Sequence, residues 1–347
     1  MNIFKKINEI YHSEMPFVAF RKPDSNIIEV FEQFDDTVYC FDDTFSVSGF
    51  VLAPFEKDKN LSVIIKADKK YQEDLKNNHI GFPAKKEIPI CNIEKEKHIQ
   101  LIEKAIEQMQ KGVFEKVVLS RKITLNHKAN PVEVFEKMTN HYPSAFCYLF
   151  SHPKIGIWIA ATPEKLLNVH KNYIYTMALA GTQPYKEQGD HIWKEKEKDE
   201  QQIVTDVILS KIATHVDNLD VSTVKTVRAG NVVHLCTDIT AKLKSNENPF
   251  TIVNELHPTP AVCGFPNKEA KQFIIENEHY NRSYYSGYCG VVNGNEKSID
   301  FYVNLRCMQL ENNQIFIYVG GGILKESNSQ AEWEETQNKA QTMFAIL

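Results

Sequence analysis

The chain has 347 residues, 42% of them hydrophobic and 24% charged, and a formal net charge of −5. These values suit a folded protein of one large or two smaller domains, and they exclude the basic composition typical of nucleic-acid binding. The first residues lack the apolar core of a signal peptide, and no stretch approaches the roughly 18 apolar residues of a membrane span. Seven scattered cysteines without a CxxC pair predict reduced thiols in a cytoplasmic protein, and they favour neither a zinc site nor a disulfide framework.

The first 95 residues alternate short apolar runs with turn residues, which indicates strands after one leading helix. The segment 68–95 is rich in lysine and interrupted by prolines, so it predicts a surface connection. From residue 96, apolar residues recur at helical spacing up to Gly112, which stands where a helix would end.

The remainder of the chain is predicted to be mainly strands. They are expected at 117–125, within 146–181, within 221–243, and at 288–294, 298–310 and 314–323. Two further helices are expected, within 190–217 and at 330–345. Because strands and helices do not alternate strictly, the pattern favours an α+β fold of antiparallel sheets covered by helices over a parallel dinucleotide-binding sheet.

Two pairs of glutamates are each spaced three residues apart: Glu197 with Glu200, and Glu332 with Glu335. On a helix, each pair shares one face. Carboxylates from two helices that meet in a cleft would suit Mg²⁺, which prefers oxygen ligands and often takes one or two carboxylates together with an anionic ligand. Solvated surface is the alternative for each pair, and Glu332 has a second alternative in a capping box with Ser329.

Three further residues are candidates for acid–base chemistry. Lys116 precedes an apolar strand, and a lysine acts as a base only where burial removes it from water. Glu164 follows Pro163, and a carboxyl group kept protonated by an apolar pocket can act as an acid. His257 lies in a stiff loop with two prolines, a setting common at binding sites. Exposed, inert positions are the alternative for Lys116 and Glu164, and a structural hydrogen bond is the alternative for His257.

Anion recognition is indicated by an arginine and by glycines. Arg306 lies in a predicted strand, and its planar guanidinium group suits a carboxylate. Gly320, Gly321 and Gly322 follow a strand, and glycines there let backbone N–H groups approach an anion. Their order matches neither GxGxxG nor a P-loop, so dinucleotides and ATP are not expected. ALAGT at 178–182 is a second glycine-bearing loop, and a plain turn is the alternative for both.

Ten short blocks occur in the order typical of the chorismate-utilising enzymes. They are FEKVVLSR, ATPEKLL, ALAGT, EKDEQQIV, VVHL, LHPTPAVCG, NRSYYSGYCG, LRCM, GGGI and EWEETQNK. On these blocks the chain resembles that family, which includes isochorismate, salicylate, anthranilate and aminodeoxychorismate synthases. The resemblance implies a four-layer α-β-β-α sandwich in which 96–347 form the chorismate-binding core and 1–95 a strand-rich part of the same fold.

The resemblance also implies a role for each candidate residue. Glu200 and Glu335 would bind Mg²⁺ directly, and Glu197 and Glu332 would act through water. The implied chorismate-binding residues are Gly181, Thr182, Ala261, Tyr285, Gly287, Arg306, Gly320, Gly321, Gly322 and Lys339. Gln201 departs from the family, in which histidine is common at this position.

Within this family, two positions indicate the reaction. Lys116 resembles the base of members that add water, whereas Ala261 matches the alanine of isochorismate synthases in place of the threonine of other members. Glu164 would protonate the leaving C4 hydroxyl, with His257 nearby. The implied activity is a Mg²⁺-dependent isomerisation of chorismate to isochorismate by a monomer without a glutaminase partner, for menaquinone or catechol siderophore biosynthesis. A salicylate synthase and a non-catalytic chorismate-binding protein are the alternatives.

Overall fold

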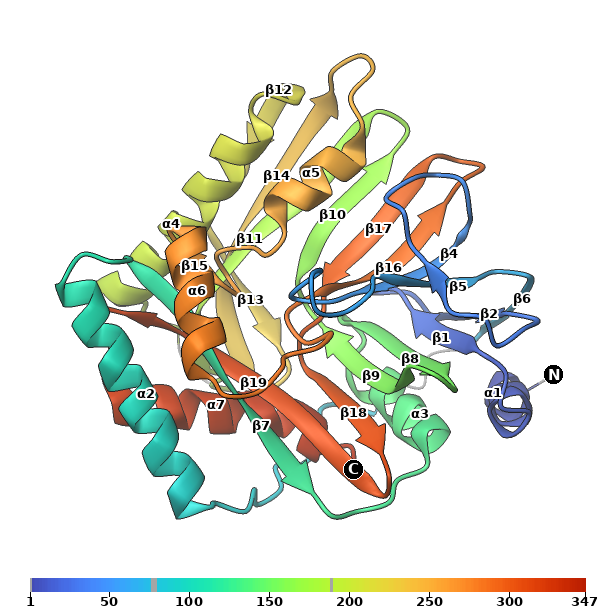
Figure 1. Cartoon of the computed structure of the whole chain (residues 1–347), viewed down its shortest axis with the longest axis horizontal. Coiled ribbons are helices and arrows are strands. Elements are labelled where there is room, and N and C mark those ends of the chain that lie inside the picture. Colours follow the sequence, from blue (N-terminus) through green and yellow to red (C-terminus); the bar gives the residue numbers. More distant parts are fainter. Residues whose placement is uncertain (1, 76–79, 188–189) are drawn as a thin grey trace.

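The computed structural model describes residues 2–75, 80–187 and 190–347, which form two antiparallel sheets flanked by helices (Figure 1). The helices are α1 (Ile3–His12), α2 (Asn92–Gln110), α3 (Pro131–His141), α4 (Glu195–Ile212), α5 (Pro249–Leu256), α6 (Asn267–Asn277) and α7 (Ser329–Phe344). Among the described residues, no helix combines the length and the apolar character that crossing a membrane requires.

Within these residues, one sheet has nine strands and the other has ten. The nine-stranded sheet has the spatial order β15 (Gly264–Phe265), β7 (Lys116–Leu125), β19 (Gln314–Leu324), β18 (Cys307–Glu311), β9 (Gly156–Thr162), β8 (Phe146–His152), β1 (Phe17–Arg21), β2 (Ile27–Glu32) and β6 (Lys69–Asp74). The ten-stranded sheet has the order β12 (Val216–Val221), β14 (Val232–Leu243), β11 (Tyr173–Pro184), β10 (Lys165–His170), β17 (Ser298–Val303), β16 (Tyr288–Asn293), β4 (Gly49–Ala53), β5 (Val63–Lys66) and β3 (Tyr39–Cys40); β13 (Lys225–Ala229) pairs with β14 beside this path.

Aromatic side chains from both sheets fill the space between them. The ring of Phe146 in β8 stacks on that of Tyr302 in β17, with centroids 4.1 Å apart. The same buried cluster contains Phe20, Phe50, Tyr148 and Trp158. Burying one large apolar side chain contributes about 1.5–3 kcal/mol, so this layer holds the two sheets face to face.

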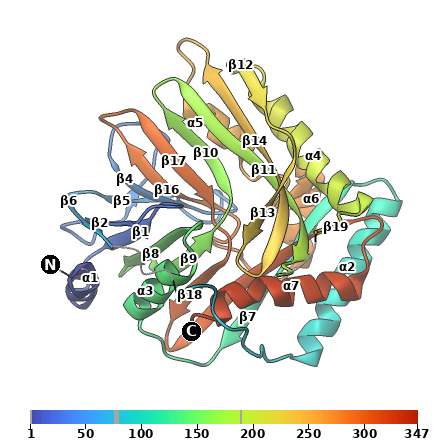
Figure 2. The same ribbon diagram turned by 180° about the vertical axis from the view of Figure 1, so that it is seen from behind.

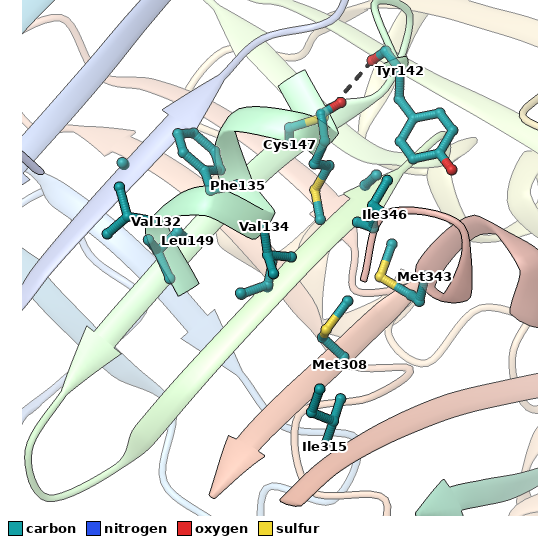
Figure 3. Packing of buried hydrophobic residues seen from close by; sticks show 14 of the residues in the cluster. Val132, Val134, Phe135, Tyr142, Cys147, Leu149, Met308, Ile315, Met343 and Ile346 are labelled. Carbon is teal, nitrogen blue, oxygen red and sulfur yellow. Dashed lines mark hydrogen bonds between the residues drawn. The ribbon is translucent and has the colours of Figure 1, made fainter. Parts of the chain in front are cut away.

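Helices cover the outer face of each sheet. On the nine-stranded sheet, Val134 of α3, Met308 of β18 and Met343 of α7 belong to one core cluster (Figure 3). On the ten-stranded sheet, α4 and α5 bury side chains such as Ile208 against the strands, and Figure 2 shows α4 running along β11 and β14 from behind. The predicted α+β sandwich of antiparallel sheets is therefore confirmed.

Two local predictions were wrong. The segment 68–95 contains the edge strand β6, whose lysine-rich sequence hid its pairing with β2. The expected strand 298–310 is interrupted at 304–306, where the chain leaves β17 of one sheet and enters β18 of the other. Arg306 has a positive φ of 47° at this crossing, which a continuous strand would not allow.

A second crossing between the sheets lies beside the first. The chain passes from β9 to β10 through Pro163 and Glu164. The N–H of Val303 donates to the carbonyl of Glu164 at 2.9 Å, and the N–H of Ala161 donates to the carbonyl of Arg306 at 3.0 Å. These bonds fix the two crossings side by side, so Glu164 and Arg306 reach the same space between the sheets.

Candidate active site

A small pocket, here called the central pocket, lies at these crossings and has a volume of about 60 Å³. Ten of the sequence-predicted residues line it: Glu164, Gly181, Thr182, Glu200, Ala261, Tyr285, Arg306, Gly320, Gly322 and Lys339. They come from both sheets, from the loop after α5 and from helices α4 and α7. The structure thus gathers most of the predicted site around one space.

Lys116 is fully buried at the first residue of β7. Backbone pairing with Leu324 of β19 and with Phe265 of β15 fixes its position. Its Nζ lies 3.1 Å from Oε1 of Glu200 on α4. Burial opposes ionisation of Glu200, but the ammonium groups of Lys116 and Lys339 hold the pKa of Glu200 below its ordinary value. The two side chains therefore form a buried ion pair at the edge of the central pocket.

Glu164 is a buried carboxyl group on the opposite chain crossing. Burial raises its pKa from 4.5 to about 8, although the positive charges of Lys116 and Lys339 act in the other direction. At neutral pH the group is therefore mainly protonated and can donate a proton to a ligand in the central pocket.

Arg306 is held by a histidine to which the sequence assigned no role. An Nη2–H of Arg306 donates to Nε2 of His234 at 3.1 Å, and Nη1–H donates to Thr342 Oγ1 at 3.3 Å. His234 Nδ1–H donates to the carbonyl of Gly181 at 3.0 Å. Burial, together with the charges of Arg306 and Lys339, lowers the pKa of His234 well below its ordinary value. The ring is neutral, and its free Nε2 orients the guanidinium group; the VVHL block was its only sequence signal.

The three consecutive glycines lie within β19, as the predicted strand 314–323 has them, so they are not a turn after it. A side chain at Gly322 would place its Cβ 2.2 Å from Glu200 Oε1, and one at Gly320 would reach within 2.8 Å of the Tyr285 hydroxyl. Gly321 faces α7, where a Cβ would lie 3.4 Å from Glu335 Oε1. The glycines therefore leave room for carboxylates and a ligand on both faces of the strand.

Gly181 also lies within a strand, at an irregularity in the register of β11 between Ala180 and Thr182. Its φ is +71°, and a Cβ there would lie 2.9 Å from the carbonyl oxygen of Glu197. The glycine thus lets the N-terminal turn of α4 approach β11 closely, which brings Glu200 to the pocket.

The other three glutamates line a neighbouring opening, here called the glutamate opening, which shares Thr182 with the central pocket. Its charged lining residues are Lys186, Lys194, Lys196, Glu197, Glu332, Glu334 and Glu335. Glu335 Oε1 lies 2.7 Å from Lys339 Nζ, and Glu332 pairs with Lys196. Lys339 also donates to the carbonyl of Gly320 at 3.1 Å, which connects this opening to the central pocket.

Glu332 does not cap its own helix, α7, whereas Glu197 takes part in a capping box at the start of α4. Asn328 is the N-cap of α7, and its side chain accepts from the N–H of Ala331. At the start of α4, the carboxylate of Glu197 accepts from the N–H of Lys194 at 2.9 Å. Glu332 is instead buried beside the pocket, where its Oε2 has no hydrogen-bond partner among the described residues.

These carboxylates suit a hard divalent cation. Burial and the nearby charge of Glu335 raise the pKa of Glu332 to about 7 against the influence of Lys196, and a cation would relieve that repulsion. The described residues contain no group of three or more acidic, histidine or cysteine side chains that would enclose a metal alone. Mg²⁺ commonly needs only one or two carboxylates, with water and a ligand completing its shell, so the residues fit this ion.

Four predicted site residues line neither the central pocket nor the glutamate opening: Lys116, Gly321, His257 and Gly287. Lys116 and Gly321 lie beside Glu200 and Glu335, and the other two make structural contacts. His257 Nε2–H donates to the carbonyl of Pro54 at 3.0 Å, and burial lowers its pKa to about 3. A Cβ on Gly287 would lie 1.9 Å from the carbonyl oxygen of Ala53, so this glycine permits close packing against β4. Neither His257 nor Gly287 lines the central pocket, and the contacts with the ligand expected for both stay predictions. His257 anchors the loop that presents Ala261.

Gln201, where the family commonly has histidine, points away from the pocket. Its Nε2 donates to the hydroxyl groups of Thr205 at 2.8 Å and Thr237 at 2.7 Å. The amide therefore joins α4 to β14, and it does not hydrogen-bond to Glu200.

Comparison with known proteins decides the family. Residues 46–347 match the sequence model of the chorismate binding enzyme family. The chain belongs to this family. The match begins at residue 46, earlier than the resemblance seen in the sequence from residue 96.

Two curated relatives show the same kinship. The isochorismate synthase EntC of Escherichia coli strain K12 is 30% identical over 259 residues, which cover 72% of the chain and 66% of that protein. The isochorismate synthase MenF of Haemophilus influenzae is 28% identical over 256 residues, which cover 71% of the chain and 59% of that protein. The matched part thus spans less than two thirds of the length of either relative.

The fold is shared with solved structures of low sequence identity. The 2,3-dihydroxybenzoate-specific isochorismate synthase DhbC from Bacillus anthracis superimposes with a TM-score of 0.82 at 21% identity, covering 99% of both chains. The menaquinone-specific isochorismate synthase MenF from Escherichia coli gives 0.79 at 20% identity, covering 96% of this chain and 88% of that one. Both matches confirm the predicted fold of the chorismate-utilising enzymes.

Proposed function

We propose that the chain is an isochorismate synthase, an isomerase that converts chorismate reversibly to isochorismate. The observation that carries the proposal is a fully buried lysine, Lys116, at the edge of the pocket that the buried carboxyl group of Glu164 lines, with the pKa of that carboxyl group raised to about 8. A protein that only binds chorismate has no need of such an acid–base pair. The names of the relatives EntC and MenF support the same reaction.

In the proposed mechanism, Lys116 removes a proton from a water molecule that attacks C2 of the ring, and Glu164 donates a proton to the departing C4 hydroxyl. Arg306, oriented by His234, binds the enolpyruvyl carboxylate. Lys116 must be neutral to act as a base, so it has to separate from Glu200. Its side chain is fully buried, so separation from this charge partner leaves the amine away from bulk water.

We propose Mg²⁺ as the cofactor, held directly by Glu200 and Glu335, with Glu197 and Glu332 acting through water. The buried, unpartnered Oε2 of Glu332 and the repulsion between Glu332 and Glu335 support an ion at this place. When bound, Mg²⁺ orients the ring carboxylate and offsets its charge. The backbone around Gly181, Gly320 and Gly322 leaves the space in which the substrate lies.

Incubation of the protein with chorismate and Mg²⁺, followed by mass spectrometry of the products, tests this function. We expect isochorismate, which retains the enolpyruvyl group. Salicylate with free pyruvate would identify a salicylate synthase, and tight binding without turnover would identify a chorismate-binding protein; either result contradicts the proposal.

We further propose that the enzyme works as a monomer in the cytoplasm without a glutaminase partner. All seven cysteines are free and five of them are buried, which supports a reducing compartment. Addition of water requires no ammonia, so no glutaminase is needed. The product would serve menaquinone or catechol siderophore biosynthesis, since relatives specific for menaquinone and for 2,3-dihydroxybenzoate share the fold.

A further inference from the structure

Two openings of opposite charge flank the central pocket. The glutamate opening carries four carboxylates and three lysines among its described lining residues. On another side lies a cavity of about 250 Å³, here called the arginine cavity, which shares Pro163 and Arg306 with the central pocket. Its described lining residues are Phe82, Tyr142, Pro143, Ser144, Ala145, Ala161, Pro163, Arg228, Ala229, Gly230, Arg306 and Thr342, none of which is acidic.

Arg228 is exposed and is held in a fixed orientation. Its guanidinium carbon lies 3.8 Å from the ring centroid of Phe82 and 3.4 Å from that of Tyr185. Its Nε–H donates to the carbonyl of Gly230 at 3.0 Å. Because stacking and this hydrogen bond fix the plane of the group, little side-chain freedom is lost when a carboxylate binds to its Nη atoms.

Arg306 forms the inner end of the same cavity. It is buried, and its side-chain hydrogen bonds go to the neutral partners His234 and Thr342. Its positive charge is therefore available to an anion from the arginine cavity as well as from the central pocket. The walls between the two arginines are apolar, with Tyr142, Ala145 and Ala161, and suit an unsaturated ring.

We propose that the arginine cavity is the route by which the substrate reaches the central pocket, with Arg228 as a binding residue that captures a carboxylate before Arg306 does. This inference rests on the proposed function, because it takes a dicarboxylate as substrate. The chain has a net charge of −5, so its overall charge does not attract a dianion. A basic opening without carboxylates raises the local concentration of the dianion, whereas the glutamate opening has one more carboxylate than ammonium groups and favours the cation.

The volumes agree with this division. The central pocket has a volume of about 60 Å³ and the arginine cavity one of about 250 Å³. A ring with two carboxylate-bearing arms fits the second space, whereas the first is too small to hold it without movement of the residues that line it. Arg228 therefore governs the capture of substrate and not the chemical step.

Steady-state kinetics of the full-length Arg228→Met variant with chorismate and Mg²⁺ test the route. We expect kcat/KM to fall about 10-fold at low ionic strength, with kcat unchanged, because electrostatic steering accelerates association by at least this factor. The loss should shrink as NaCl rises from about 20 to about 200 mM, since salt screens exposed charges. Arg228→Lys, which retains the charge, should recover most of kcat/KM.

Lys242→Met is the matched control. Lys242 is exposed on β14, and its loss changes the net charge equally without altering either opening. If kcat/KM of the Arg228→Met variant lies within about twofold of that of this control at low salt, the route is overturned, because steering should change kcat/KM by about 10-fold or more. A loss that falls on kcat also overturns it. If the wild-type protein does not convert chorismate, the proposed function fails instead, so the two failures are distinguishable.

Discussion

Burial between the two sheets gives Lys116 and Glu164 their chemistry. Both side chains are removed from water, and burial is the main cause of the raised pKa of Glu164. Ordinary exposed residues of these types would be a protonated lysine and an ionised glutamate at neutral pH. The proposed mechanism requires the reverse for both residues. Burial supplies it for Glu164, whereas Lys116 is paired with Glu200 in this structure.

Replacement of either residue should abolish turnover while the fold is retained. Lys116→Met and Glu164→Gln each remove one proton transfer, so we expect kcat to fall at least 10²- to 10⁴-fold, roughly the contribution of general acid–base catalysis. Kinetic assays and circular dichroism measure the two effects. Lys122→Met, on the same strand but half-exposed, serves as the control. Wild-type rates in either variant would rule out the role assigned to that residue.

Glu164 should also make stability depend on pH. Its pKa is about 8 in the folded protein against an ordinary 4.5, so between these values the folded state keeps a proton that the unfolded chain loses. The free energy of unfolding therefore falls as pH rises through this window, by up to about 1.4 kcal/mol per pH unit. Glu164→Gln lacks this decrease and should gain stability relative to wild type as the pH rises.

Urea denaturation of both proteins at about pH 5 and about pH 8 measures this gain. Glu332, with a pKa of about 7, titrates in an overlapping window in both proteins, so the difference between them isolates Glu164. A stability difference that does not change with pH would show that Glu164 is ionised in the folded protein.

Among the elements, strand β19 controls the geometry of the site through its glycines. Gly322→Ala would place a Cβ 2.2 Å from Glu200 Oε1 and 3.2 Å from Lys116 Cε, so it must displace the buried ion pair. We expect kcat/KM to fall by about 10²-fold, the usual cost of misplacing a catalytic group. In Gly321→Ala the nearest contact of the added Cβ is Glu335 Oε1 at 3.4 Å, so kcat/KM should fall far less. Steady-state kinetics that rank the two variants in the opposite order would contradict this account.

The sequence predicted whole elements better than the points where the chain changes direction. Helix α7 and strand β7 follow apolar periodicities that continue to their ends, so their bounds were close to those observed. The change of sheet at Asn304–Arg306 interrupts no apolar pattern and was missed. The glycines of β19 were predicted inside the strand 314–323, but the sequence did not show that their small size is needed for packing against Glu200 and Tyr285.

The candidate site followed from the sequence only in part. The spacing of the glutamates and the position of Lys116 did not distinguish these residues from exposed surface residues. Only the order of the ten blocks predicted that they form a site. His257 and Gly287 belong to those blocks but serve packing, which sequence order cannot distinguish from contact with a ligand. His234 acts through Arg306, a relation between β14 and a chain crossing that depends on the fold.

At the scale of the whole molecule, the site depends on helices α4 and α7, which lie beside β19. Each helix contributes two of the four glutamates. We expect a chelator such as EDTA to stop turnover and added Mg²⁺ to restore it, because without an ion Glu200 remains paired with Lys116. Mg²⁺ should also raise the melting temperature near neutral pH by relieving the repulsion between Glu332 and Glu335. Undiminished activity in chelator would remove the metal from the mechanism.

The central claim is that buried Lys116 activates water for attack on C2 while Glu164 assists loss of the C4 hydroxyl. Turnover of chorismate in ¹⁸O-labelled water, with the product analysed by mass spectrometry, tests it most directly. The account predicts isochorismate that carries one ¹⁸O atom in its C2 hydroxyl and retains the enolpyruvyl group. Unlabelled isochorismate would show that the hydroxyl migrates without exchange with water, and it would contradict the role of Lys116 as the base.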